Sequence, residues 1–267
     1  MNKGFAAAHV SAYTSAVLIC TAGAVMTSIT RYNFKVLIYD PDTYARHAIY
    51  TFLAWDRRTR VTFRAKSLED MWQHLRTAPM AERPDYIVFD ANHLGSANRL
   101  RETLEMIHEA LPKCRVVCMV QQVDPDLVQA AAEKGAKAFL LKQDVNLRIG
   151  WAIVYAEKRD FTVTPQVVEA VRSARNIHPR LQKAAILPPS LKFPQLTSRV
   201  QEALELWLGG MPAYLVADEL GIGLSTVRGY IKKAYRILES SVDLEFPDEI
   251  TQQERAFLRY TALDERE

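Results

Sequence analysis

The chain has 267 residues, 49% of them apolar, which is enough for two ordinary domains that each bury a core. Its formal net charge of +3 is mild, so any affinity for a polyanion must come from the placement of the charges rather than from their total. The three cysteines, Cys20, Cys114 and Cys118, are too few for a disulfide framework and indicate a reducing compartment. We therefore expect a cytoplasmic protein.

The N-terminal segment is apolar but irregular. Residues 5–29 contain no Asp, Glu, Lys or Arg, and this run is long enough to cross a bilayer. Within it, Ala22-Gly23-Ala24 resembles a signal-peptidase site. The Ser, Thr, Tyr and Gly residues of the run dilute its hydrophobicity, so we predict that residues 1–32 form a disordered extension. A membrane anchor and a signal peptide are the alternatives.

From residue 33 onward, strand-like and helix-like segments alternate. The continuous apolar run at 34–40 predicts a strand buried on both faces, and a helix follows at 44–55. The same pattern recurs four times, with strands at 60–65, 85–90, 115–120 and 138–141 and helices at 68–76, 100–110, 125–134 and 145–158. Five such units predict a doubly wound parallel five-stranded sheet, an α/β domain at residues 33–158.

Three charged residues fall at the ends of predicted strands. Asp40, Asp90 and Lys142 each end one, and the carboxyl ends of parallel strands are where such sheets bind ligands. With "GAKAFLLK" at 135–142, this half resembles a CheY-like receiver domain of response regulators. The resemblance implies that Asp90 is a phosphoacceptor, that Lys142 neutralises the phosphoryl group, and that Asp40 and Asp90 hold Mg²⁺.

The receiver motifs are incomplete. Pro41 follows Asp40 where the family has a second acid, although Asp42 comes next, and Val120 replaces the Thr or Ser that ends the fourth strand. Phosphoryl transfer needs a divalent cation, and a pocket of Asp40 and Asp90 holds one weakly unless Asp42 turns in. We expect a degenerate receiver used for dimerisation or ligand sensing, with phosphorylation of Asp90 by a histidine kinase as the alternative. His93 is expected to be exposed rather than catalytic, and no enzymatic activity is expected.

Residues 159–195 are predicted to be a linker. A short helix is indicated from Pro165, but four further prolines interrupt the segment, at positions 179, 188, 189 and 194.

Three helices are predicted after the linker, at 197–208, from 212 to 220, and from about 224 onward. In the third, "LSTVRGYIKKAYRIL", apolar residues recur at helical spacing and line one face, while Arg228, Lys232 and Arg236 form a neighbouring stripe. Like charges at this spacing repel by a few tenths of a kcal/mol each, so stability does not explain the stripe. A polyanionic partner does.

This segment resembles the C-terminal DNA-binding domain of LuxR/NarL/FixJ-type regulators. The features that match are Leu196-Thr197-x-Arg199, Gly210, Val216-Ala217, Leu220-x-Ile222 and Thr226-Val227-Arg228. The resemblance implies a helix-turn-helix at 196–240 that binds double-stranded DNA as a homodimer, on two-fold symmetric operators. The DNA contacts that it implies come from the third helix, at Arg228, Gly229 and Lys232. We expect Lys233 and Arg236 to contact phosphates or steer the helix towards them, with Thr226 as a further candidate contact.

A protein-interaction adaptor is the alternative function. Basic and acidic residues are equal in number within residues 196–240, and sigma-factor region 4 uses a similar helix to bind RNA polymerase. The tail at 241–267 is predicted to add a further helix, with Thr251 and Glu254 as a capping box. Two roles fit this helix, closing the domain or pairing two subunits.

Overall fold

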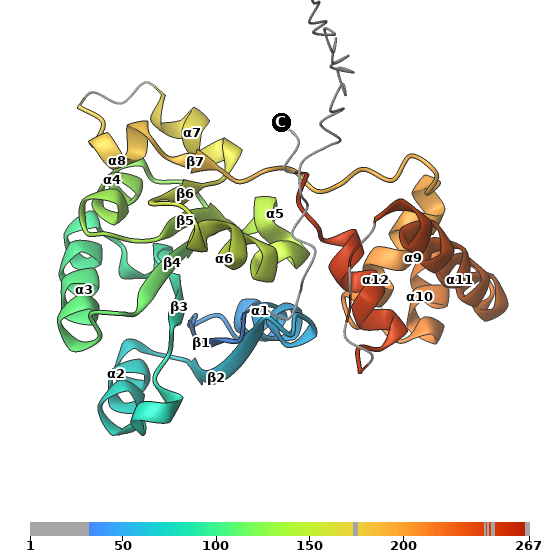
Figure 1. Ribbon diagram of the computed structural model, residues 1–267, viewed down its shortest axis with the longest axis horizontal. Helices are drawn as coiled ribbons and strands as arrows, with labels where there is room; N and C mark the ends of the chain where they lie inside the picture. Colours follow the sequence, from blue (N-terminus) through green and yellow to red (C-terminus); the bar gives the residue numbers. More distant parts are fainter. Residues whose placement is uncertain (1–31, 173–175, 243, 245, 247–248, 265–267) are drawn as a thin grey trace, which may run out of the picture.

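The computed structural model describes residues 32–172, 176–242, 244, 246 and 249–264. These form a sheet domain and a helical domain, which lie beside one another with the last helix between them (Figure 1). The predicted extension at 1–32 falls outside the described residues, except for Tyr32. Among the residues that are described, no helix has both the length and the apolar character needed to span a bilayer.

The sheet is parallel throughout, as predicted, but it has seven strands rather than five, in the order β2-β1-β3-β4-β5-β6-β7. The five expected strands are β1 (Phe34–Tyr39), β2 (Thr59–Ala65), β3 (Tyr86–Asp90), β4 (Arg115–Val120) and β5 (Ala138–Leu141). Two short additional strands are β6 (Thr162–Val163) and β7 (Ala185–Ile186). Both lie in the segment whose prolines predicted a linker.

Two of the prolines are compatible with folded structure in that segment because they begin helices. Pro165 starts α7 (Pro165–Val171) and Pro179 starts α8 (Pro179–Gln182). At the first position of a helix the backbone N–H has no acceptor within the helix, so proline loses no hydrogen bond there. Arg180 in α8 anchors the segment, since its guanidinium donates to the Ala132 carbonyl at 2.9 Å and pairs with Asp160 at 2.9 Å.

Helices cover both faces of the sheet. One face carries α2 (Leu68–Thr77), α3 (Ala97–Ala110) and α4 (Pro125–Glu133), and the other carries α1 (Thr43–Trp55) and α6 (Ile149–Glu157). Short helical turns complete the domain, namely η2 (Met80–Glu82), η3 (Asn92–Leu94), α5 (Lys142–Val145) and η4 (Asn146–Arg148). The predicted helix at 145–158 is therefore divided, and Asn146 adopts a positive φ of 43° at the break.

The helical domain contains the three predicted helices, α9 (Ser198–Leu208), α10 (Ala213–Leu220) and α11 (Leu224–Ser241). Gly221 ends α10 with a φ of 63°, a left-handed conformation that glycine adopts without strain. The helix-turn-helix geometry follows from this sharp turn, because α11 then packs across both α9 and α10.

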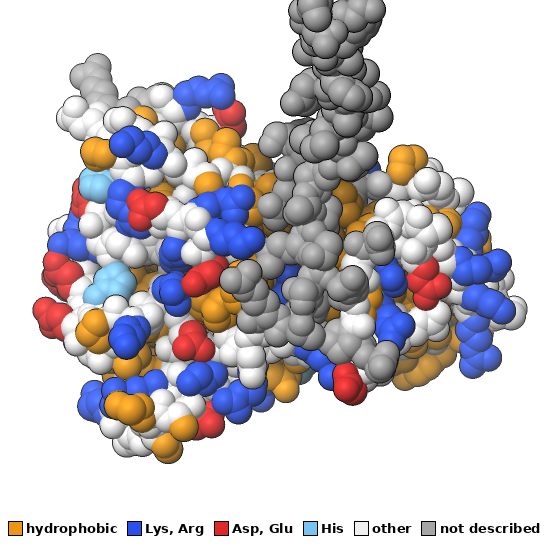
Figure 2. Space-filling view, viewed as in Figure 1, with side chains coloured by type: hydrophobic (Ala, Val, Ile, Leu, Met, Phe, Trp, Pro, Cys, Tyr) orange, Lys and Arg blue, Asp and Glu red, His pale blue; other side chains and the backbone are white. Residues whose placement is uncertain are grey.

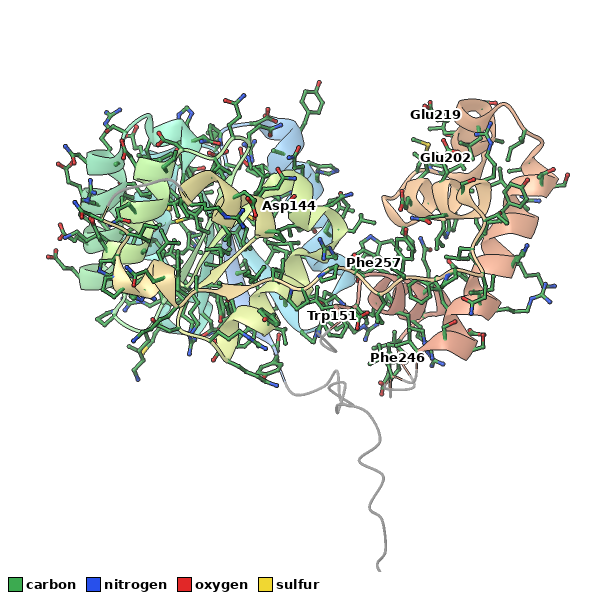
Figure 3. The ribbon with its side chains drawn as sticks, turned by 90° about the horizontal axis from the view of Figure 1, so that it is seen from above. Asp144, Trp151, Glu202, Glu219, Phe246 and Phe257 are labelled. Carbon is green, nitrogen blue, oxygen red and sulfur yellow. The ribbon has the colours of Figure 1, made fainter. Side chains whose placement is uncertain are left out.

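The tail forms α12 (Gln252–Tyr260), and the predicted capping box is present at its start. This helix lies between the domains: the Phe257 ring stacks on Trp55 of α1, and the Trp151 indole of α6 donates to the Leu258 carbonyl at 3.2 Å (Figure 3). A salt bridge from Arg57 to Glu254, 3.2 Å long, adds to the contact. One apolar core therefore extends from the α1–α6 face of the sheet through α12 into the helical domain.

Candidate nucleic-acid interface and receiver pocket

Helix α11 is two-sided, as its sequence predicts. Val227, Ile231 and Leu238 are buried, and they hold the helix against α9 and α10. The side chains expected to face DNA are all exposed, and they are Thr226, Arg228, Lys232, Lys233 and Arg236. Basic side chains gather at the edge of the helical domain where α11 lies (Figure 2). A buried apolar face thus fixes the direction in which the cations point.

The four cations of α11 are electrostatically unbalanced. Within the described part of the chain none of them forms a salt bridge, whereas Arg199 of the same domain is paired with Glu202 at 2.9 Å. Gly229 is also exposed, and a Cβ placed on it would meet no atom within 4 Å. Packing inside the chain therefore does not require glycine at this position, which leaves room for the close approach of an external partner.

Part of this helix faces the sheet domain. Arg228, Lys232 and Arg236 line a cleft of about 790 Å³ whose other walls include Trp55 of α1 and Gln252 of α12. Gly229 and Lys233, which follow Arg228 and Lys232 in the sequence, do not line this cleft. We call this space the interdomain cleft. Sequence reasoning did not identify Trp55 as part of this face, because the contact depends on how the two domains pack.

The predicted receiver residues are brought together at the carboxyl edge of the sheet. Lys142 Nζ donates to Asp40 Oδ2 at 2.7 Å and to Asp90 Oδ2 at 2.6 Å. Burial raises the pKa of Asp40 above its ordinary value, although Lys142 acts in the opposite direction. Burial also opposes the charge on Lys142, but its hydrogen bonds to Asp40 and Asp90 outweigh this and raise its pKa. The lysine is thus held protonated between two carboxylates.

Asp42 does not join this group. Its Oδ1 caps α1, accepting from the Tyr44 and Ala45 amides at 2.7 and 2.9 Å, and only its own backbone N–H reaches Asp40. Among the described residues no three His, Cys, Asp or Glu side chains gather as metal ligands would. Since Mg²⁺ prefers several oxygen ligands in octahedral geometry, the residues present do not fit a built magnesium site.

The loop that follows β4 is held by a residue that the sequence did not single out. Val120 is fully buried, and after it the Gln121 and Gln122 amides donate to Asn92 Oδ1 at 2.6 and 3.1 Å. His93 is exposed, and its backbone N–H, not its ring, binds Asp90. The side-chain amide of Asn92 therefore connects the loops after β3 and β4.

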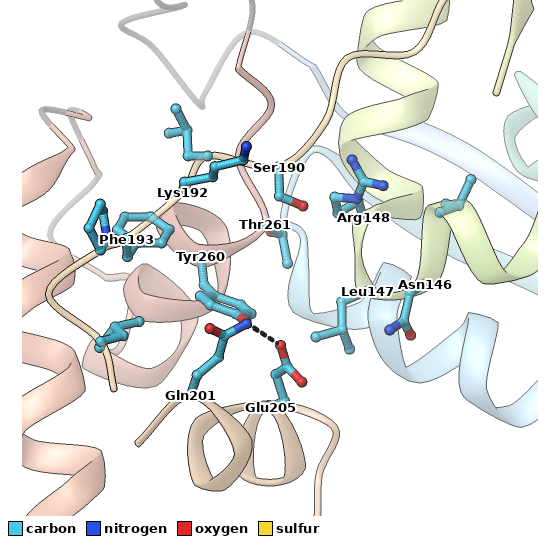
Figure 4. Close-up of a pocket in the computed structure, with 14 residues that line it drawn as sticks. Asn146, Leu147, Arg148, Ser190, Lys192, Phe193, Gln201, Glu205, Tyr260 and Thr261 are labelled. Carbon is cyan, nitrogen blue, oxygen red and sulfur yellow. Dashed lines mark hydrogen bonds between the residues drawn. The ribbon is translucent and has the colours of Figure 1, made fainter. Parts of the chain in front are cut away.

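A second cavity, of about 490 Å³, lies where η4, the chain after β7, α9 and α12 meet (Figure 4). Tyr260 donates to Glu205 across it, and Arg148 at its side donates to the Pro188 carbonyl at 3.0 Å. Arg148 is thus engaged by a backbone carbonyl and Glu205 by the Tyr260 hydroxyl, so these two charged groups serve contacts between segments of the chain.

The comparisons with known proteins agree with the motifs. No family model matches the chain. It is 26% identical over 157 residues to the transcriptional regulatory protein DesR of Bacillus subtilis (strain 168), a match that covers 59% of this chain and 68% of DesR.

Solved structures of the response regulator RcsB align with the chain at low identity. The RcsB–DNA complex covers 86% of this chain and 100% of its own, with a TM-score of 0.44 and 16% identity. RcsB of Salmonella typhimurium covers 82% of this chain and 96% of its own, with a TM-score of 0.43 and 16% identity. With DesR as a sequence relative, the resemblance to response regulators with a LuxR-type helix-turn-helix, predicted from the motifs, is confirmed.

Proposed function

We propose that this protein is a DNA-binding transcription regulator of the cytoplasm, in which a degenerate receiver domain controls or dimerises a LuxR-type helix-turn-helix. The observation that carries the proposal is α11, which exposes four cations without acidic partners in the described structure while its opposite face is buried. A helix about 10–12 Å across fits a major groove about 12 Å wide. DesR, the sequence relative, is itself named a transcriptional regulatory protein.

The roles of the α11 side chains follow from their positions. Arg228 and Lys232 lie in the first half of the helix, which enters the groove in helix-turn-helix proteins, so they bind base edges. Lys233 and Arg236 contact phosphates, and Thr226 does the same from the first turn. Gly229 lets the backbone approach the duplex. A homodimer would place two such helices on a two-fold symmetric operator.

The receiver half is proposed to work without magnesium-dependent phosphorylation. Lys142 already neutralises much of the charge of Asp40 and Asp90, Asp42 is engaged as a helix cap, and Val120 has no hydroxyl to respond to a phosphoryl group. This activity needs no enzymatic chemistry. The equal number of basic and acidic residues within residues 196–240 favours the adaptor alternative, but the placement of four cations on one exposed side of α11 supports DNA binding.

The test is DNA binding by the Arg228→Ala, Lys232→Ala double variant, measured by fluorescence anisotropy on operators selected from random duplex DNA. We expect affinity to fall at least tenfold and discrimination between the operator and random DNA to decrease, because each lost base contact costs about 1–3 kcal/mol. Arg199→Ala is the matched control, since Arg199 is an exposed, paired cation of the same domain. Unchanged affinity and unchanged discrimination in the double variant would contradict the assignment of α11.

A further inference from the structure

The interdomain cleft has the size of a small-molecule site. Its volume of about 790 Å³ lies within the range of roughly 300–1,000 Å³ that such sites occupy. Four separate parts of the chain form its walls: α1, the turn between α9 and α10, α11 and α12. A ligand bound there would contact both domains at once.

The charge of the cleft is entirely of one sign. Arg228, Lys232 and Arg236 line it, and no Asp or Glu is among its lining residues. These three cations have no salt-bridge partner in the described part of the chain. An anion is therefore the ligand that this wall would recognise.

The remaining walls are mainly aromatic and apolar. Trp55, Trp207 and Tyr235 line the cleft together with Met211 and Ile231. All three rings are held in place, because the Trp207 indole donates to the Tyr235 hydroxyl at 2.8 Å and Trp55 stacks on Phe257. Fixed aromatic surfaces favour a flat aromatic body, which can stack on them without ordering flexible side chains.

We propose that the interdomain cleft binds a planar aromatic anion, an aromatic ring system that carries a carboxylate or a sulfonate. The rings lie against Trp55 and Trp207, and the acidic group pairs with Lys232 and Arg228. Binding in the cleft is independent of the proposed function. One consequence does rest on the proposed function. The ligand would occupy cations that contact DNA, so the ligand and the operator would compete.

The test uses 1-anilinonaphthalene-8-sulfonate as the probe, with the full chain and no DNA. We expect saturable binding at one site, with energy transfer from tryptophan. Lys232→Gln should weaken it about tenfold, the usual effect of losing one charge-assisted hydrogen bond. Lys233→Gln is the matched control, because this neighbouring lysine does not line the cleft. The affinity of this variant for the probe should equal that of the wild-type chain. Trp55→Ala should also weaken binding.

Competition by two matched naphthalenes tests the chemistry of the ligand. 1-Naphthoate should displace the probe, and the neutral 1-naphthalenemethanol should do so at least tenfold less well. Non-saturable binding, equal effects of the two lysine variants, or equal competition by the acid and the alcohol would each overturn the proposal.

The DNA arm separates this proposal from the proposed function. In anisotropy experiments, 1-naphthoate should release the operator from the wild-type chain but about tenfold less effectively from Trp55→Ala, since Trp55 belongs to the sheet domain and should not contact DNA. If the chain binds the probe but not DNA, the ligand site in the cleft is supported and the proposed DNA-binding function is refuted. If it binds DNA but not the probe, the DNA-binding function is supported and the ligand site is refuted.

Discussion

Two helical glycines, Gly150 and Gly229, differ in whether their surroundings leave room for a side chain. Gly150 in α6 lies against the buried ion pair of Asp56 and Arg58, which is 2.6 Å long, and the Arg58 guanidinium stacks on the Trp151 ring at 3.8 Å. A Cβ on Gly150 would lie 2.8 Å from Asp56 Cγ and closer still to Oδ2. Gly229 in α11 has no atom within 4 Å of that position.

Alanine substitution should separate the two sites in urea unfolding. Gly150→Ala displaces a buried carboxylate from its partner, so the free energy of unfolding should fall by about 3–5 kcal/mol. Gly229→Ala should instead raise it by about 0.5–1 kcal/mol, because alanine is the better helix former at an exposed site. In the same variant, operator affinity should fall if the backbone approaches DNA there. A destabilising Gly229→Ala would mean that its surroundings are not open.

Lys142→Met tests the receiver pocket at the level of its charges. In the folded protein the pKa of Asp40 lies above its ordinary value of 3.8, so ionisation of Asp40 lowers the stability of the fold. The stability that protonated Asp40 contributes is fully present below about pH 3.8, and it is lost as the pH rises through the folded pKa. Without the lysine that loss must grow, since two buried carboxylates would face one another. We expect a destabilisation of about 3–5 kcal/mol at pH 7 that nearly disappears at about pH 3.

The control for this variant is Lys134→Met, which removes a more exposed pair with Glu105 and should cost less than about 1 kcal/mol at either pH. A destabilisation by Lys142→Met that did not depend on pH would show that the lysine acts through packing of its stem rather than through its charge.

At the scale of elements, the sequence predicted those features that depend on local periodicity. The five long strands and the opposite faces of α11 follow from apolar spacing alone, and the structure confirms them. Strands β6 and β7 were missed because each has two residues, too few for a periodic signal, and prolines surround them. The strand-end placement of Asp40, Asp90 and Lys142 was predictable. The capping role of Asp42 was not predicted, although an Asp directly before a helix is an N-cap signal, because the receiver resemblance pointed to this residue as a metal ligand.

Asn92 joins the loop after β3 to the loop after β4, and no sequence motif indicates this contact. Its removal should have a local effect. Asn92→Ala leaves the Gln121 and Gln122 amides without their acceptor, and this should cost about 1–2 kcal/mol of local stability. Hydrogen exchange at these two amides should become about tenfold faster, with β4 itself unaffected. Asn98→Ala, on the surface of α3, should change neither amide. Equal exchange in both variants would show that the loop is held by other contacts.

At the scale of the whole molecule, α12 determines how the two domains meet. Its apolar residues Ala256, Phe257 and Leu258 are buried, and its neighbours are α11 on one side and α1 on the other. The cleft that Arg228, Lys232 and Arg236 face exists because α12 holds the helical domain against Trp55. If α11 enters a major groove, the walls of the groove lie on both sides of the helix, and the sheet domain lies on one of these sides. We therefore expect the domains to separate before the operator binds fully.

Phe257→Ala should shift this equilibrium. Loss of a buried phenylalanine costs about 3–5 kcal/mol, and here the cost falls on the contact between the domains. We expect the radius of gyration in small-angle scattering to increase and operator affinity to rise, because in a larger fraction of molecules Arg228, Lys232 and Arg236 then lie away from the sheet domain, where a duplex can reach them. Leu104→Ala is the matched control, since it truncates an equally buried side chain on the opposite face of the sheet. It should lower stability without changing either measurement. If Phe257→Ala expanded the molecule but left operator affinity unchanged, the closed arrangement would not limit DNA binding, and the cleft would affect α11 only through a bound ligand.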